Sequence, residues 1–99
     1  MVRIIYYDIT DSKGRTKLHD YLEAQGFDRI QYSVFVGTID LHRWQKVWAR
    51  ICSLHAQYCA DTDKIYTHLI DAQHFEKMLT LGHGPDTDWI LHKTEVLFV

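Results

Sequence analysis

Apolar residues dominate the start of the chain, where the run from Val2 to Tyr7 ends at Asp8. A nearly continuous run of β-branched and aromatic residues predicts a central strand that is covered on at least one face. Polar residues follow, among which Asp11 can cap a helix, and Gly26 supplies the left-handed residue that ends many helices. We therefore predict a first strand over residues 2–7 and a first helix over about Ser12–Gln25.

In the middle of the chain, the spacing between successive hydrophobic residues changes from two to three or four. Between Phe27 and Thr38, every second residue from 30 to 36 is apolar or aromatic, which predicts either one bent strand or a short hairpin. Asp40 can then cap a second, amphipathic helix, because the apolar residues after it recur at helical spacing. These residues are Leu41, Trp44, Val47, Trp48, Ile51, Leu54 and Tyr58.

Three further segments complete the predicted fold. The composition predicts a strand over Lys64–Ile70, a short helix within Asp71–Leu81 and a final strand over Glu95–Val99. Without that last strand, the order of elements predicts an α+β fold, the ferredoxin-like βαββαβ sandwich with both helices on one face of an antiparallel sheet. The tail strand, over about residues 94–99, has no vacant edge in this sheet. We therefore predict that it adds to the sheet of a partner chain.

The length of 99 residues fits a single domain over residues 1–99, with its core over about residues 1–81. A core of this size leaves apolar faces that a second copy can cover, so we expect a homodimer. Two cysteines are too few for a disulfide framework, and no apolar stretch reaches the length of a membrane span. Both observations favour a cytoplasmic protein with no membrane partner.

The formal net charge of -2 argues against a protein that coats nucleic acid through bulk positive charge. The charge is unevenly distributed, since residues 1–50 hold eight Lys and Arg against six Asp and Glu, and residues 51–99 hold three against seven. The first half is thus the electropositive one, and a dimer would double its modest patch. The sequence has no GxGxxG, Walker or GxSxG motif, so nothing in it supports a nucleotide-cofactor enzyme or a serine hydrolase.

Asp8 is the first candidate for chemistry, because it stands where a strand ends and a polar loop begins. One carboxylate is a poor metal site, but a two-fold axis nearby would bring a second Asp8 from a partner chain. Two carboxylates with water and a substrate phosphate suit Mg²⁺ or Mn²⁺, and such an ion would polarise a phosphodiester and activate water. By spacing alone, an ordinary turn carboxylate explains Asp8 equally well and is commoner.

Other polar residues near Asp8 have two interpretations each. Asp11 follows at three residues, and a helix N-cap explains it more simply than a second metal ligand does. The cations Lys13, Arg15 and Lys17 would either hold a phosphate or solvate a helix face. Ser33 would either orient a water molecule or serve as a half-buried polar strand position. A zinc site among the histidines and cysteines of the second helix is disfavoured, because no CxxC or HExxH pattern is present.

Two segments, at a suitable distance from each other, resemble a known family pattern. They are residues 5–11, Ile-Tyr-Tyr-Asp-Ile-Thr-Asp, and residues 26–37, Gly-Phe-Asp-Arg-Ile-Gln-Tyr-Ser-Val-Phe-Val-Gly, with Arg15, Leu18 and Leu22 between them. In these residues and in its length the chain resembles the Cas2 family of CRISPR-associated proteins. The resemblance is close from Val2 to about Trp44 and looser beyond, where only the order of the elements is kept.

The resemblance implies a ferredoxin-like homodimer whose tail strands cross over, and which acts with the Cas1 integrase in spacer acquisition, an antiviral defence. Several family members are similar to metal-dependent endonucleases on RNA or DNA, with the strand-ending aspartate, here Asp8, binding Mg²⁺ or Mn²⁺ at the dimer axis. The catalytic residues it implies are Asp8 and Ser33. The nucleic-acid contacts it implies are at Tyr7, Arg15, Lys17, Arg29 and Phe35. Lys17 stands where the family often has a second arginine, whose forked guanidinium a lysine does not reproduce.

Three other functions are compatible with the same fold. The first is a non-catalytic dimeric scaffold that bridges Cas1 subunits and contacts the DNA backbone. Its contacts would be Arg15, Lys17, Arg43, Lys46 and Arg50. The second is a toxin-like ribonuclease of the virulence-associated protein D type, which a neighbouring antitoxin gene would distinguish. The third is an RNA-recognition domain, although the aromatic strand motif of that class is missing. Fold alone does not decide among these functions.

Overall fold

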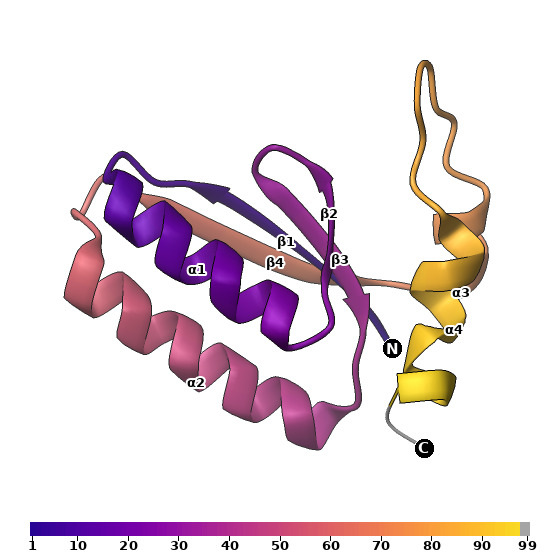
Figure 1. The fold of residues 1–99 in the computed structure, drawn as a ribbon, viewed down its shortest axis with the longest axis horizontal. Coiled ribbons are helices and arrows are strands. Elements are labelled where there is room, and N and C mark those ends of the chain that lie inside the picture. The colour runs from indigo at the N-terminus through magenta and orange to yellow at the C-terminus, as the bar shows by residue number, and fades with distance from the viewer. Residues whose placement is uncertain (98–99) are drawn as a thin grey trace.

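The computed structural model describes the backbone of residues 1–97 and the side chains up to residue 92. Its elements, in chain order, are β1 (Val2–Asp8), α1 (Ser12–Ala24), β2 (Asp28–Gln31), β3 (Val34–Thr38), α2 (Leu41–Tyr58), β4 (Lys64–Ile70), α3 (Ala72–Glu76) and α4 (Thr87–Leu97). The four strands form one sheet in the order β2-β3-β1-β4, with antiparallel neighbours throughout. Helices α1 and α2 lie side by side across one face of the sheet (Figure 1). This confirms the predicted α+β, ferredoxin-like arrangement.

The predicted helix boundaries are confirmed by the hydrogen bonds at their ends. The carboxylate of Asp11 accepts a bond from the backbone N–H of Lys13 at the start of α1, and Asp40 accepts one from Arg43 at the start of α2. After α1, Gly26 takes the positive φ of 90° that lets the chain turn into β2. Of the two alternatives for residues 27–38, the hairpin is correct, since β2 and β3 pair across a turn.

The sheet carries a hydrophobic cluster on each face. Alternation along β1 sends Ile5 and Tyr7 toward α1 and α2, and sends Val2 and Ile4 to the opposite face. The cluster under α1 and α2 is the larger one. Within it, the ring of Phe27 lies against Gly37, where an added Cβ would approach a ring carbon to 2.7 Å.

The outer face of the sheet, opposite α1 and α2, is only partly covered. Helix α4 packs over one end, where its buried Ile90 and Leu91 join Val36 and Phe75. At the other end an aromatic patch remains in contact with solvent. The aromatic patch consists of Tyr6, Tyr66 and His68. Tyr6 pairs with Tyr66 across the strands, and its ring stacks on His68 at 5.6 Å between centroids.

The C-terminal part of the chain differs from the prediction. Residues 71–81 form only the five-residue α3, and the predicted tail strand is wrong, because the backbone is helical through Leu97. Helix α4 begins where Asp86 accepts bonds from the N–H groups of Trp89 and Ile90. The helix that buries Ile90 and Leu91 against the sheet continues through residues 95–97, where it satisfies its own backbone hydrogen bonds, whereas a strand there would need a neighbouring strand for them. Residues 98 and 99 of the predicted strand lie outside the described residues.

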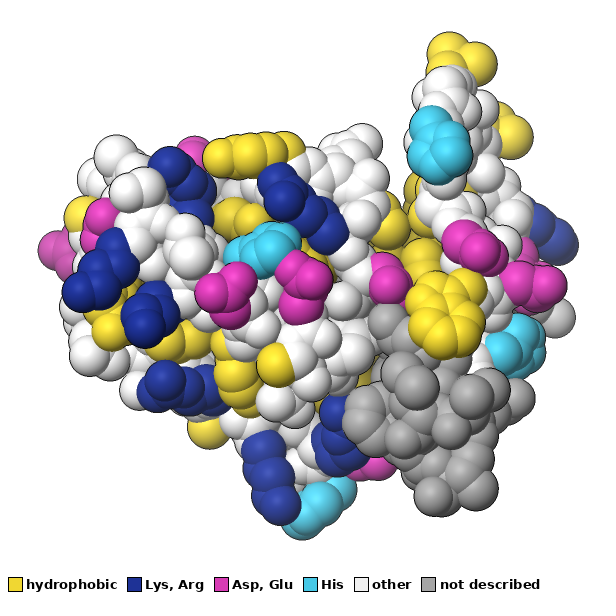
Figure 2. All heavy atoms as spheres, viewed as in Figure 1, with side chains coloured by type: hydrophobic (Ala, Val, Ile, Leu, Met, Phe, Trp, Pro, Cys, Tyr) yellow, Lys and Arg dark blue, Asp and Glu magenta, His cyan; other side chains and the backbone are white. Residues whose placement is uncertain are grey.

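A loop between α3 and α4 projects from the body of the molecule (Figure 1). Leu79 and Leu81 in this loop are 98 % and 101 % exposed, and hydrophobic side chains are visible at its tip in Figure 2. Most of the Lys and Arg side chains visible in Figure 2 lie over α1, α2 and the hairpin, which agrees with the prediction that the first half of the chain is the electropositive one. Among the described residues, no helix is long and apolar enough to cross a membrane.

Candidate functional site

Asp8 ends β1, the strand that β3 and β4 flank on either side. Its side chain is exposed, and in the register of the sheet it lies opposite Lys64. Side chains two residues apart share a face of a strand, so Asp8 belongs to the same face as Tyr6 and the aromatic patch. The carboxylate therefore stands at the open end of the outer face of the sheet.

A hollow of about 220 Å³ lies beside Asp8 and is called the Asp8 hollow below. Its lining residues are Tyr7, Asp8, Ile9, Arg15, Tyr32 and Ser33. They come from the end of β1, the first turns of α1 and the β2–β3 turn. Because these segments meet only in the folded chain, residues 25 positions apart in the sequence face one space.

Two hydrogen bonds tie the walls of the Asp8 hollow together, and a third joins one of these walls to Arg29. The backbone N–H of Tyr7 donates to the carbonyl oxygen of Ser33 at 3.0 Å, and its phenol donates to the carbonyl oxygen of Tyr32 at 3.1 Å. The Nε of Arg29 donates to the same Tyr32 oxygen at 3.1 Å. Burial raises the pKa of the Tyr7 phenol, against the opposing effect of nearby Arg29 and Arg15, so the phenol stays a donor. The turn that carries Ser33 is thus fixed to the strand that carries Asp8.

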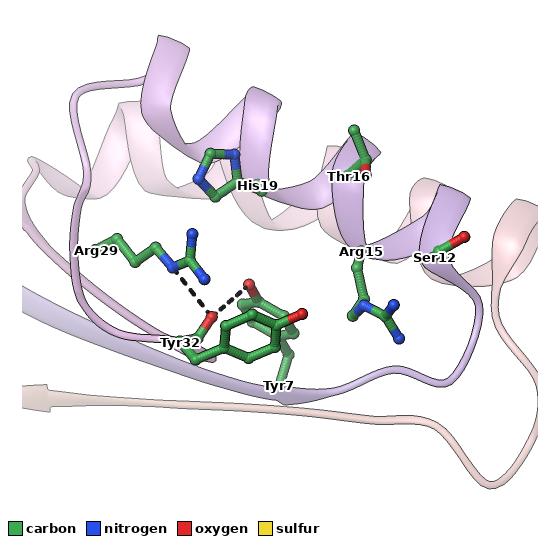
Figure 3. Close-up of a pocket in the computed structure, with 7 residues that line it drawn as sticks. All are labelled: Tyr7, Ser12, Arg15, Thr16, His19, Arg29 and Tyr32. Atoms are coloured by element: carbon green, nitrogen blue, oxygen red, sulfur yellow. Dashed lines mark hydrogen bonds between the residues drawn. The ribbon is translucent and has the colours of Figure 1, made fainter.

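Arg15 fixes the loop on the other side of Asp8. One guanidinium nitrogen donates to the carbonyl oxygens of Ile9 at 3.0 Å and Thr10 at 2.9 Å. Arg15 also lines a second hollow, of about 240 Å³, called the α1 hollow below. Its lining residues, drawn in Figure 3, are Tyr7, Ser12, Arg15, Thr16, His19, Arg29 and Tyr32. The two hollows share Tyr7, Arg15 and Tyr32, so they are neighbours along one groove.

The buried carboxylate of Asp63 holds the loop after Asp8 in place. Asp63 is 6 % exposed and accepts bonds from the Thr10 backbone N–H at 3.1 Å, the Thr10 hydroxyl at 3.0 Å and the Ala60 N–H at 2.9 Å. The bonds from Ala60 and Thr10 hold the pKa of Asp63 below its ordinary value. Asp63 therefore ties the loop after β1 to the loop before β4.

The structure brings most of the predicted site residues together. Asp8, Tyr7, Arg15 and Ser33 line the Asp8 hollow, and Arg29 lines the α1 hollow next to it. Two predicted nucleic-acid contacts lie elsewhere. Phe35 is fully buried, so the implied direct contact is wrong in this chain, and its ring instead supports Tyr7 and His19 from the core. Lys17 is exposed on α1 but lines neither hollow.

Sequence reasoning missed four residues of the α1 hollow. Ser12, Thr16 and His19 lie on one face of α1 with Arg15, at spacings of three and four residues. This polar stripe lies beside the buried face of Gly14, Leu18 and Leu22, and two of its members are exposed, so in the sequence it has the pattern of an ordinary solvated helix face. Tyr32 also carries no local signal, because its exposure depends on the turn between β2 and β3.

Asp8 fits a divalent cation only as half of a site. In the described part of the chain, no group of three or more His, Cys, Asp or Glu side chains is close enough together to hold a metal ion. Mg²⁺ in phosphate-processing sites is commonly bound by one or two carboxylates together with waters and substrate phosphates. One chain supplies one carboxylate at a solvent-accessible strand end, so a second copy would supply the second carboxylate of such a donor set.

The sequence of the chain matches a known family over most of its length. A family model described as CRISPR associated protein Cas2 matches residues 1–78. The chain belongs to the Cas2 family. Among curated relatives, CRISPR-associated endoribonuclease Cas2 2 of Pyrobaculum aerophilum is 50 % identical over 40 residues, which are 40 % of this chain and 44 % of the relative. CRISPR-associated endoribonuclease Cas2 1 of Methanospirillum hungatei is 42 % identical over 48 residues, 48 % of this chain and 50 % of the relative. The chain thus spans about half the length of the curated Cas2 relatives it matches.

Solved structures agree with the fold. A hypothetical protein from Thermus thermophilus is 25 % identical, with a TM-score of 0.67 over 85 % of this chain and 93 % of its own. Cas2 from Streptococcus pyogenes, crystallised at pH 6.5, is 23 % identical, with a TM-score of 0.64 over 83 % of this chain and all of its own (100 %). The Cas2 fold is therefore shared, and the Asp8 region lies inside the part of the chain that the family matches.

Proposed function

We propose that this Cas2 protein is a homodimeric, Mg²⁺-dependent (or Mn²⁺-dependent) endonuclease of spacer acquisition that hydrolyses phosphodiester bonds in RNA or DNA. Its site would use Asp8 from both chains. The observation that carries the proposal is the exposed Asp8 carboxylate at the rim of a hollow that also contains Arg15 and Ser33. The curated relatives named endoribonucleases support the same class of reaction.

The outer face of the sheet supports the homodimer. Tyr66 is 63 % exposed and Tyr6 is 37 % exposed, although both belong to strands whose other residues enter hydrophobic clusters. An exposed aromatic surface of this kind is typical of an interface. Because Asp8 shares this face, a second copy that covers the aromatic patch around a two-fold axis would bring the two Asp8 carboxylates toward each other.

Each residue of the site has a separate task in the proposed reaction. A cation held by the two Asp8 carboxylates would polarise the phosphodiester and lower the pKa of the attacking water. The guanidinium group of Arg15, which lines the Asp8 hollow, would bind the phosphodiester and balance its charge. Ser33, whose backbone is fixed by Tyr7, would orient the attacking water through its hydroxyl. The Cas1 integrase remains the proposed protein partner.

The test compares Asp8→Asn with the wild-type protein in a nuclease assay on labelled RNA and DNA, with Mg²⁺ and with EDTA. Asp8→Asn should lower the cleavage rate by about 100-fold or more, because several kcal/mol of transition-state stabilisation depend on the ion. The control is Asp11→Asn, which removes a charge three residues away while asparagine keeps the helix cap. Equal cleavage by wild type and Asp8→Asn, or cleavage unaffected by EDTA, would refute the proposed reaction.

A non-cleaving scaffold is the second candidate function. Lys46 and Arg50 are exposed one turn apart on α2, and neither lines the two hollows. A scaffold that binds the DNA backbone would need these two residues and would not need Asp8. If a strain that carries Asp8→Asn still acquires spacers while one that carries both Lys46→Ala and Arg50→Ala does not, the scaffold function is the one that matters in the cell.

A further inference from the structure

The α1 hollow has the composition of a binding site for an anion with an attached ring. The stripe of Ser12, Arg15, Thr16 and His19 forms one wall, and Arg29 and Tyr32 face it from the hairpin (Figure 3). Tyr7 forms the floor, with its phenol bonded to the turn. Three elements thus present hydroxyl, guanidinium and aromatic groups to one space.

The two guanidinium groups make this space electropositive. The three ion pairs among the described residues all involve histidines, so neither Arg15 nor Arg29 is matched there with a carboxylate. Arg29 is bonded only through its Nε to the Tyr32 carbonyl, as far as the described residues show. Two arginines with hydroxyl groups beside them are a suitable set of donors for a phosphate.

Tyr32 supplies a surface for a ring. It is 70 % exposed at the tip of the hairpin, and the guanidinium of Arg29 lies 4.8 Å from the centre of its ring. An exposed tyrosine held over an arginine is the kind of platform on which unpaired bases stack. The rigid turn presents this platform without first having to order a loop.

His19 lines the α1 hollow, and both of its ring nitrogens already contact carboxylates, so neither is available to a ligand. Its Nδ1 lies 3.2 Å from Asp20 and its Nε2 lies 2.8 Å from Glu23, while the ring packs edge-on against Phe35. Both nitrogens are engaged by carboxylates of the same helix. His19 therefore limits the length of the hollow and is not assigned a proton-transfer role.

We propose that the α1 hollow binds one nucleotide of a single-stranded nucleic acid, with its phosphate on Arg15 and Arg29 and its base stacked on Tyr32. At about 240 Å³ the hollow is smaller than a pocket for a drug-sized ligand, so it holds a phosphate and sugar while the base rests at its mouth. A duplex keeps its bases stacked inside and cannot use Tyr32 in this way. The inference rests on the proposed function in one respect. Because the α1 hollow and the Asp8 hollow share lining residues, the nucleotide in the α1 hollow would be the neighbour of the phosphodiester that is cleaved at Asp8.

The test measures binding without cleavage. Fluorescence anisotropy of a labelled oligothymidine and of a duplex of the same length is recorded in EDTA, with all variants in an Asp8→Asn background. Tyr32→Leu should weaken single-strand binding about fivefold or more, the low end of the effect of losing one stacked base, and leave duplex binding within about twofold. Tyr32→Phe, which keeps the ring, should bind the single strand like its parent.

Two charge variants complete the design. Arg29→Ala should weaken single-strand binding more than Lys77→Ala, which removes the same charge at an exposed position that lines neither hollow. The inference is overturned if Tyr32→Leu binds the single strand as tightly as its parent, or if it loses as much affinity for the duplex. These results stay interpretable if the nuclease assay shows no role for Asp8, because neither a metal nor cleavage takes part in them.

Discussion

Asp63 determines how firmly the loop after Asp8 is held. Its carboxylate joins Thr10, 53 residues away in the chain, to the turn that begins at Ala60. The three hydrogen bonds that this buried carboxylate accepts replace the hydrogen bonds to water that it loses on folding. In addition, His55 donates from its Nε2 to the Asp63 carbonyl oxygen at 3.1 Å, so α2 is bonded to the same turn.

The prediction for Asp63→Asn is a lower unfolding midpoint at neutral pH, by several degrees. The amide offers one acceptor oxygen and an N–H₂ group that meets the Ala60 N–H without bonding to it. Thermal unfolding followed by circular dichroism measures the difference. Asp61→Asn, a neighbouring exposed position, is the control and should unfold like the wild type.

The same pair of proteins should show a pH-dependent difference of defined sign. The hydrogen bonds hold the pKa of Asp63 below its ordinary value in the folded chain, so its contribution is complete above about pH 4 and is lost as the pH falls through the folded value. The asparagine of the variant does not titrate, and Asp71, whose pKa the His74 N–H also lowers, is present in both proteins and cancels. The gap in unfolding midpoint between wild type and Asp63→Asn should therefore narrow from pH 6 to pH 3. A constant gap would mean that Asp63 does not act through its charge.

The sequence predicted the charged part of the site better than its aromatic part. Asp8, Arg15 and Arg29 stand in a local pattern that the printed sequence shows directly, and the structure places them around adjoining hollows. Phe35 was misjudged, because alternation tells which strand residues share a face but not which face the helices cover. Tyr32 was missed because its exposure depends on the hairpin turn.

Among the elements, α2 contributes the most buried residues to the hydrophobic cluster between the helices and the sheet. Trp44, Val47, Ile51 and Leu54 pack on the sheet from this one helix. Its first turn depends on Asp40, whose carboxylate accepts the Arg43 N–H at 2.8 Å. The cap therefore supports the packing of the whole face that covers β1.

We predict that Asp40→Ala lowers the free energy of unfolding by about 1 kcal/mol, the usual cost of losing an N-cap. Urea denaturation at pH 7 measures it, and Asp40→Asn should retain most of the stability because asparagine also caps helices. If Asp40→Asn and Asp40→Ala lose the same stability, the effect comes from the charge of Asp40 and not from the cap.

The order of elements up to β4 was predictable because each element carries its own local signals. Caps, a positive-φ glycine and a clear change of period identify α1, the hairpin and α2 in sequence. The C-terminal part was predicted less well. Its helix also has a capping aspartate, Asp86, but residues 90 and 91 lie in a short apolar stretch that fits a strand or a helix, and packing against Val36 and Phe75 favours the helix.

At the scale of the whole molecule, the uncovered half of the outer face leads to a prediction about assembly. If a second copy covers the aromatic patch, Tyr66→Glu should raise the dimer dissociation constant by about tenfold or more, since it buries a charge without a partner. Sedimentation velocity over a range of concentrations measures this, with Gln45→Glu on the exposed side of α2 as the charge-matched control. Unchanged association of Tyr66→Glu would exclude the aromatic patch as the interface.

The position of β1 also determines how its resistance to local unfolding compares with that of other parts of the chain. Strands paired on both sides and packed on both faces exchange their amide hydrogens only when the molecule unfolds as a whole, whereas exposed loops open locally at little cost. β1 is such a strand, with β3 and β4 beside it and a cluster on each face. Asp8 is thus carried by one of the last segments to open, while the loop with Leu79 and Leu81 is free to rearrange on a much shorter timescale without moving that carboxylate.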